Sequence, residues 1–154
     1  MDTLTTLLEQ ADADRSRALA NFNLVRARCD AARAQASQLE AYRSEYRQRW
    51  SRQFAQGATL EIMRCYRDFD ARLDSAITQQ GQAVRLAQAA QARASDGLSA
   101  CELRLASVRK LIERRDLAHR QAGDRHERKA DDEHATRIAL ARRGGRSGIA
   151  GVRA

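Results

Sequence analysis

The 154-residue chain contains no proline, and only 5% of its residues are aromatic. Because proline is the strongest helix breaker, only the eight glycines are left to interrupt helices. So few aromatic residues, together with 31% charged residues, leave little material for a thick globular core. We therefore expect an all-α chain that is long and thin.

Cysteine is also scarce, and the beginning of the chain has none of the features of a secretion signal. Cys29, Cys65 and Cys101 are odd in number and widely spaced, which favours reduced thiols over a disulfide framework or a zinc site. Residues 1–10 have neither a basic segment nor a cleavage site, and no apolar run approaches membrane-spanning length. We expect a cytoplasmic protein.

The motifs of catalysis are missing as well. The sequence has no glycine-rich phosphate loop, no His-Glu-x-x-His motif and no paired cysteines. Spacing allows two of His119, His126 and His134 to share a helix face, but they lack the carboxylate partners of a metal site. We expect neither an enzyme nor a bound cofactor or metal.

Apolar residues recur instead at alternating steps of four and three in two long runs. This heptad spacing defines a narrow seam that only another helix can bury, as in a coiled coil. In the first run only Arg15 and Arg43 are polar. Its positions are Leu4, Leu8, Ala11, Arg15, Ala18, Phe22, Val25, Cys29, Ala32, Ala36, Leu39, Arg43, Tyr46 and Trp50.

The second run continues the pattern beyond Gly57, with Gln80 and Gln91 as its polar members. Consecutive steps of four from Phe69 to Leu73 to Ile77 form a stutter, which locally unwinds a supercoil. Its positions are Ile62, Tyr66, Phe69, Leu73, Ile77, Gln80, Val84, Ala87, Gln91, Ala94, Leu98, Cys101, Leu105, Val108 and Ile112.

Between the runs, Gly57 is suited to end one helix and Thr59 to cap the next. We therefore predict an antiparallel coiled-coil hairpin, a rod of roughly 75 Å at the helical rise per residue. Beyond Ile112 the apolar stripe fades into a frayed, basic extension. The expected parts are helix 1 at about 3–54, a turn at about 55–59, helix 2 at about 60–140, a hairpin domain at 1–143 and a disordered basic tail at 144–154.

The net charge of +8 leaves two alternatives open besides a protein-binding hairpin. An arginine-rich C-terminal part is compatible with a nucleic-acid-associated coiled coil, although acids are interspersed and no aromatic residues interleave with the basic tail. A purely structural coiled coil that dimerises in parallel through its own seam is the other alternative.

Three segments resemble the FliJ family of bacterial flagellar export proteins, in the right order. They are Leu39 to Arg47 followed by Gly57, Tyr66 to Gln80, and Lys129 to Arg137. The resemblance implies a two-helix stalk that binds the hexameric flagellar export ATPase, the cytoplasmic domain of the transmembrane export gate, and export chaperones. It also implies a role in flagellum biogenesis and protein export. The chain would associate with the inner membrane peripherally, through these partners. We expect no nucleic-acid partner, because acids are interspersed with the arginines and no aromatic residues interleave with the basic tail.

The resemblance assigns gate contact to one stripe of the middle segment, formed by Phe69, Leu73, Ala76 and Gln80. Three of these residues also belong to the predicted seam, and a residue buried in the coil cannot face a partner. A similar choice holds for Tyr42, Tyr46, Trp50 and Tyr66 near the turn, which either fill the coil or form a landing patch.

ATPase contact is expected at the opposite end of the hairpin. There Leu7 lies off the seam beside Leu4 and Leu8, and Arg114, Arg115, Arg120, Arg125 and Arg128 follow the end of the apolar stripe. These arginines could match acidic groups of a ring, or form a solvated basic face.

Overall fold

A computed structural model describes residues 2–147, which form two helices. Helix α1 is Thr3–Ala55, with 53 residues, and helix α2 is Leu60–Ser147, with 88 residues. The described residues contain no strand. The chain divides into two units, which meet between Ala106 and Ser107. The expected all-α fold class is confirmed.

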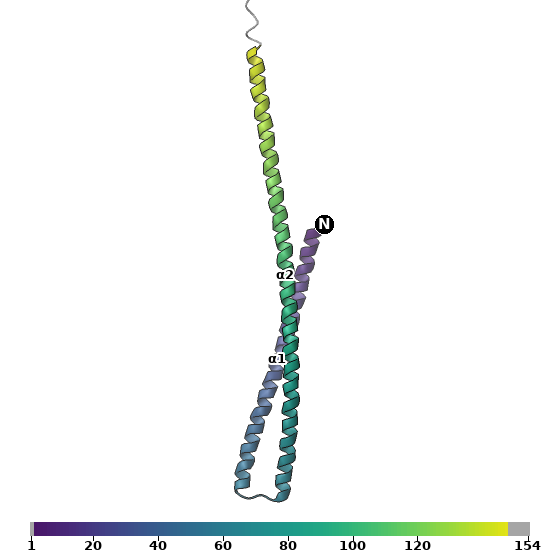
Figure 1. The fold of residues 1–154 in the computed structure, drawn as a ribbon, viewed down its shortest axis with the longest axis vertical. Helices are drawn as coiled ribbons and strands as arrows, with labels where there is room; N and C mark the ends of the chain where they lie inside the picture. Colours follow the sequence, from purple (N-terminus) through teal and green to yellow (C-terminus); the bar gives the residue numbers. More distant parts are fainter. Residues whose placement is uncertain (1, 148–154) are drawn as a thin grey trace, which may run out of the picture. The chain divides into compact units, whose positions relative to one another are not determined.

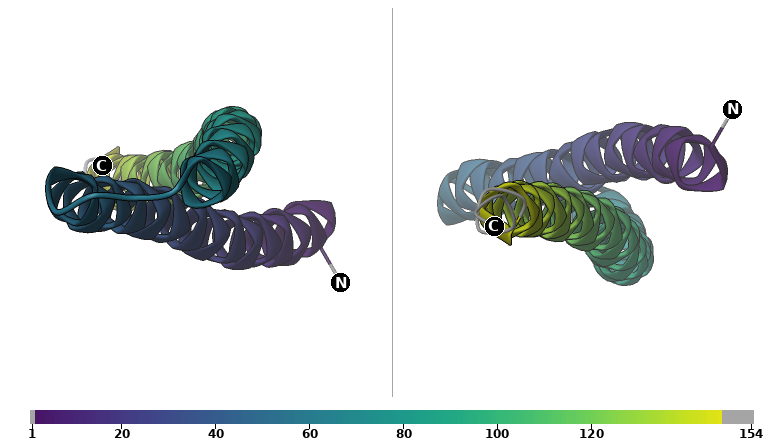
Figure 2. Two further views of the ribbon diagram at one scale, coloured as in Figure 1. Left: turned by 90° about the horizontal axis from the view of Figure 1, so that it is seen from below. Right: turned by 90° about the horizontal axis from the view of Figure 1, so that it is seen from above.

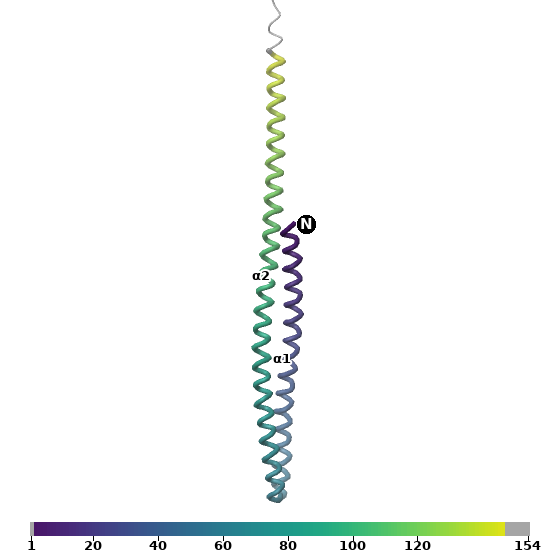
Figure 3. Tube along the Cα trace, turned by 90° about the vertical axis from the view of Figure 1, so that its right-hand side faces the viewer, coloured from purple at the N-terminus to yellow at the C-terminus, as the bar shows by residue number. Residues whose placement is uncertain are grey.

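The first unit is an antiparallel hairpin in which α1 lies beside the first half of α2 (Figure 1 and Figure 3). Ion pairs fix its register: Arg15 pairs with Glu102 at 3.9 Å, Arg43 with Asp74 at 2.7 Å and Arg47 with Asp70 at 2.8 Å. Two of these arginines, Arg15 and Arg43, are the polar members of the first heptad run. Both therefore interrupt the apolar seam at positions where an acid of α2 is within reach.

The heptad positions of α1 form its covered face. Each of the fourteen positions from Leu4 to Trp50 is buried or half-buried, and most residues between them are exposed. Ala11 and Cys29 are fully buried, at 2% and 0% exposure. The seam predicted for the first helix is confirmed.

The seam of α2 follows the prediction from Leu73 to Leu105, but two residues nearer the turn depart from it. Ile62 is 39% exposed and Phe69 is 36% exposed. Both lie where the aromatic residues of α1 face α2, and Ile62 is in the first turn of its helix. Because bulky rings hold the helices apart and the hairpin ends there, a seam position in this region has neighbours on fewer sides.

At the stutter the covered face of α2 becomes wider. Covered residues come there in adjacent pairs, Leu73 with Asp74, Ala76 with Ile77, and Gln80 with Gly81. Consecutive steps of four bring the sequence closer to the natural period of a straight helix, so two neighbouring rows share the contact.

The connection between α1 and α2 is visible in the view from below in Figure 2. The turn uses the two residues that the sequence indicated. Gly57 has a φ of 99°, a left-handed conformation that suits glycine, and its N–H donates to the carbonyl of Phe54 at 3.2 Å. The hydroxyl oxygen of Thr59 accepts a hydrogen bond from the N–H of Ile62 at 3.4 Å. Thr59 therefore acts as the N-cap of α2.

The second unit begins at Ser107 and, in its described part, is the remainder of α2. From Leu117 to Arg146 every residue is exposed. Glu133 and Arg137 form an ion pair at 3.9 Å, one helical turn apart. The helix includes Gly144 and Gly145 and ends at Ser147, so it is longer than expected. The remainder of the expected tail, 148–154, lies outside the described residues.

Candidate functional site

Six aromatic side chains form a cluster in the half of the hairpin nearest the turn, here called the aromatic ladder. Four of them repeat every four residues on α1, and two face them from α2. Tyr46 is central, with its ring centroid 4.7 Å from that of Phe69 and 5.5 Å from that of Tyr66. The ladder consists of Tyr42, Tyr46, Trp50, Phe54, Tyr66 and Phe69.

Next to the aromatic ladder, two arginines of α1 pair with two aspartates of α2. The guanidinium of Arg47 donates to both carboxylate oxygens of Asp70, at 2.8 and 3.0 Å, and to Asp74 at 3.4 Å. The hydrogen bond from Arg47 lowers the pKa of the Asp70 carboxyl and raises the pKa of Arg47. These bidentate and shared contacts hold the helices in one register.

Tyr46 contacts four of the other rings of the ladder. Burial raises the pKa of its phenol, and the neighbouring Tyr42 and Tyr66 add to the effect. Tyr46 therefore stays protonated and neutral at physiological pH. Its role in the site is packing, with no sign of acid or base chemistry.

The four gate-contact candidates have different environments. Leu73 is 7% exposed, so no partner can reach it while the hairpin is closed. Ala76 is half-buried, and the Gln80 amide donates to the carbonyl of Ala32 at 2.9 Å and to the side chain of Gln35 at 3.2 Å. Phe69 is the most accessible member of the set.

A continuous strip of residues nevertheless joins Phe69 to Gln80 across the two helices. Phe69 contacts Tyr46, which stacks on Tyr42 with ring centroids 6.3 Å apart. Tyr42, Leu39 and Gln80 then line the same open groove. We call Phe69, Tyr46, Tyr42, Leu39 and Gln80 the interhelical strip. Tyr42, at 48% exposure, is its largest accessible side chain.

The ATPase-contact candidates fall in both units. Leu4 and Leu8 are half-buried in the first turns of α1, whereas Leu7 is exposed there. In the second unit, Arg114 and Arg120 are exposed, and Arg115 is half-buried with its guanidinium 3.7 Å from the carboxylate of Asp116. Arg125 and Arg128 are exposed as well.

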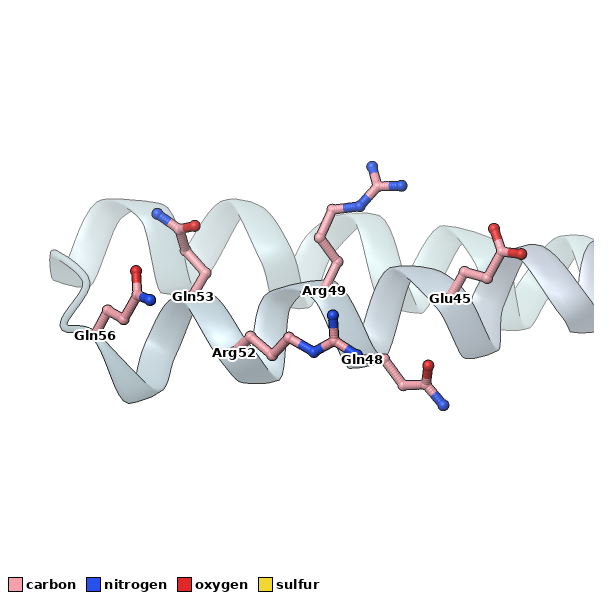
Figure 4. A pocket seen from close by; sticks show the side chains of 6 residues that line it. All are labelled: Glu45, Gln48, Arg49, Arg52, Gln53 and Gln56. Carbon is pink, nitrogen blue, oxygen red and sulfur yellow. The ribbon is translucent and has the colours of Figure 1, made fainter.

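A polar groove lies on α1 close to the turn (Figure 4). Its side chains come from one stretch of that helix and include two arginines, Arg49 and Arg52. Both arginines are exposed. The remaining lining residues are Glu45, Gln48, Gln53 and Gln56.

Reasoning from the sequence missed the ion-paired residues beside the ladder. Arg43 and Arg47 are four residues apart, as are Asp70 and Asp74, so each pair occupies one stripe of its helix. This opposite-charge pattern on facing stripes was the available signal. The exposed apolar end of α2, at Leu60, Ile62 and Met63, was also missed.

Within residues 2–147, no cluster of three or more His, Cys, Asp or Glu side chains is arranged to hold a metal ion. Over the same range, neither helix combines the length and the hydropathy that a bilayer crossing requires. Cys29 is buried, Cys101 half-buried and Cys65 exposed, and all three are free thiols.

A known protein family matches this chain. Neither the curated proteins nor the solved structures contain a match to this chain. The family described as the flagellar FliJ protein matches residues 1–144, which is nearly the whole chain. The chain therefore belongs to the FliJ family, accessory proteins of the flagellar export apparatus that are not enzymes.

Proposed function

We propose that this protein is a stalk that binds the hexameric flagellar export ATPase and the cytoplasmic domain of the export gate, and that assists delivery by export chaperones. It acts in the cytoplasm, peripherally at the inner membrane, and contributes no catalytic residue. The observation that carries the proposal is the family match over residues 1–144. The seam of α1 is also covered within the hairpin by α2, which favours a single-chain stalk over a parallel dimer.

Gate contact is best supported at the interhelical strip. Phe69 and Tyr42 offer accessible aromatic surface, of the kind that anchors protein interfaces. Leu73 supports this surface from below by closing the seam, and the Gln80 amide is already hydrogen-bonded across the hairpin. We therefore assign direct contact to Phe69 and Tyr42, and a supporting role to Leu73.

Binding of the isolated gate domain to full-length variants tests this assignment. Phe69→Ala and Tyr42→Ala should each weaken binding by about tenfold or more, as expected for a buried aromatic anchor. Leu86→Ala, at an exposed leucine of α2, is the matched control and should bind normally. Normal binding by both aromatic variants, with helicity unchanged, would remove the strip from the gate interface.

ATPase contact is supported by Leu7, an exposed leucine between two half-buried ones, and by the exposed arginines of the second unit. We propose that Leu7, Arg114 and Arg120 contact the ring, with Leu4 and Leu8 anchoring the first turns of α1. Arg115 is already close to Asp116, so it contributes less.

The measurement is ATP hydrolysis by the cognate export ATPase, with electron microscopy of ring formation. The full-length protein should stimulate hydrolysis and increase the number of rings. Leu7→Gln and the pair Arg114→Gln with Arg120→Gln should reduce stimulation several-fold, whereas Leu24→Gln, also at an exposed leucine of α1, should not. Full stimulation by every variant would exclude this contact set.

A further inference from the structure

The end of the hairpin at the turn carries exposed apolar and cationic side chains that neither proposed partner uses. Leu60 is 64% exposed, and Ile62 and Met63 are exposed beside it in the first turn of α2. Four exposed arginines flank them on the two helices, Arg49 and Arg52 on α1 and Arg64 and Arg67 on α2. We call these seven residues the turn-end surface.

The turn-end surface is layered along the hairpin. Leu60, Ile62 and Met63 lie within about one helical turn of the connecting loop, whereas the arginines lie five to eight residues from Gly57 or Thr59. At the helical rise, the arginines therefore lie roughly 8–12 Å behind the end of the hairpin. Trp50 and Tyr66 of the aromatic ladder occupy the same level.

The charge of this end is strongly positive. Between Gln48 and Arg67, the only acid is Glu61. None of the four arginines forms an ion pair with another described residue, unlike Arg43 and Arg47 farther from the turn. Their guanidinium groups are therefore available to an anionic partner.

We propose that the turn-end surface binds directly to an anionic lipid membrane. The apolar side chains enter the boundary between headgroups and acyl chains, the arginines contact lipid phosphates, and Trp50 and Tyr66 lie at the headgroup level. An interfacial segment typically buries its apolar face about 5–10 Å deep, a range that overlaps the distance from the end of the hairpin to the arginines. This goes beyond the proposed function, in which only protein partners bring the chain to the membrane.

A lipid surface fits this end better than a protein groove does. The apolar residues are at the convex end of a two-helix hairpin, and they line neither of the two grooves described above. Positive charge is also present on both helices around the end, as a planar anionic surface requires. An acidic protein partner is the competing outcome of the test.

The test measures binding of the full-length protein to two kinds of vesicle. One consists of pure phosphatidylcholine, and the other contains ~30% phosphatidylglycerol as its anionic lipid. Trp50 is the only tryptophan of the chain, so its emission reports on this end of the hairpin. We expect co-sedimentation with anionic vesicles only, a blue shift of Trp50 emission, and weakening in high salt.

Two matched variant pairs locate the contact. Arg49→Gln, Arg52→Gln, Arg64→Gln and Arg67→Gln together should weaken partitioning by about fivefold per arginine. The control combines Arg26→Gln, Arg28→Gln, Arg85→Gln and Arg93→Gln, which removes the same charge from exposed sites elsewhere on the hairpin. Leu60→Gln with Met63→Gln should abolish the blue shift, whereas Leu24→Gln with Leu86→Gln should leave it intact.

Three results would overturn the proposal. The first is a failure of the unaltered protein to bind anionic vesicles, which would leave the turn-end surface to an acidic protein. The second is equal weakening by both sets of arginine substitutions, because binding would then depend on net charge and not on this surface. The third is vesicle binding without any change in Trp50 emission.

Discussion

The two halves of the hairpin use the same heptad spacing but differ in what they bury. Away from the turn, the seam contains small and aliphatic residues, and Ala11, Cys29, Ala94 and Leu105 are all buried. In the half nearest the turn, Leu73 is the only described seam residue that is fully buried. Six aromatic rings occupy the remainder of that half.

Side-chain size accounts for this difference. Alanine lets two helix backbones approach closely, so the seam excludes water almost completely. Aromatic rings fill a wider separation and leave part of each ring accessible, as for Tyr42 and Phe69. The half away from the turn is therefore the more tightly packed, and the half nearest the turn leaves more aromatic surface accessible.

The largest effect on stability should come from the two buried leucines, one in each half. Leu73→Ala and Leu105→Ala should each lower the free energy of unfolding by about 2–5 kcal/mol, because each removes a buried side chain and leaves a cavity. Urea unfolding, followed through the helical circular-dichroism signal at ~222 nm, measures this loss of stability. Leu86→Ala, at an exposed leucine, is the control and should change the free energy of unfolding very little. If Leu73→Ala lowered it no more than Leu86→Ala does, the half nearest the turn would have no core.

The next largest effect on stability should come from enlarging a small seam residue, and it should differ between the two halves of the hairpin. Ala11→Leu should cost about 1–3 kcal/mol of stability, since its site is fully packed. Ala76→Leu, at a half-buried site near the aromatic ladder, should cost less, and Ala27→Leu, at an exposed site, should cost nothing measurable. Equal costs at Ala11 and Ala76 would contradict the difference in packing, as measured by thermal unfolding.

The aromatic ladder should contribute a smaller, directional energy. A double-mutant cycle with Tyr46→Leu and Phe69→Leu should give a coupling energy of about 0.5–1.5 kcal/mol, because the two rings contact each other. The corresponding cycle between Tyr46 and Phe22, which lies on the same helix far from the ladder, should give none. A coupling energy of zero between Tyr46 and Phe69 would mean that the rings of the ladder contribute only by filling volume.

The smallest expected effect is the ion pair of Asp70. Arg47 lowers the pKa of the Asp70 carboxyl below its ordinary value of 3.8. The ion pair therefore contributes to folding stability above pH 3.8, and this contribution is lost as the pH falls through the lower pKa of the folded state. At neutral pH, Asp70→Asn should therefore cost about 0.2–1 kcal/mol, and the difference from the unaltered protein should vanish in strong acid. Asp68→Asn, at an exposed acid, is the control in the same pH series of thermal unfolding.

Much of the fold was predictable because a heptad pattern encodes its own burial. The spacing from Leu4 to Trp50 identified the covered face of α1, and Gly57 and Thr59 identified the turn through their special backbone roles. The exposure of Ile62 and Phe69 was not predictable from spacing, because it depends on how far the opposite rings separate the helices. The helical state of Gly144 and Gly145 was also missed, since a glycine-rich, basic segment without apolar periodicity was expected to be disordered.

The candidate site was less predictable, because it depends on contacts between distant residues. The pairing of Arg43 with Asp74 requires the exact register of two helices, and a heptad pattern alone does not fix that register because it repeats every seven residues. Whether Phe69 and Leu73 face outward or inward likewise followed from the side chains opposite them. The assignments of gate and ATPase contacts stay predictions.

The cross-hairpin ion pairs also constrain how such a chain can change its length. Arg15 with Glu102, Arg43 with Asp74 and Arg47 with Asp70 lie at matching distances on either side of one fixed centre. A single inserted residue in one arm would move every pair beyond it out of reach, whereas equal insertions in both arms would restore them. Viable length variants of this hairpin should therefore gain or lose whole heptads symmetrically, in the manner of a zipper extended on both sides.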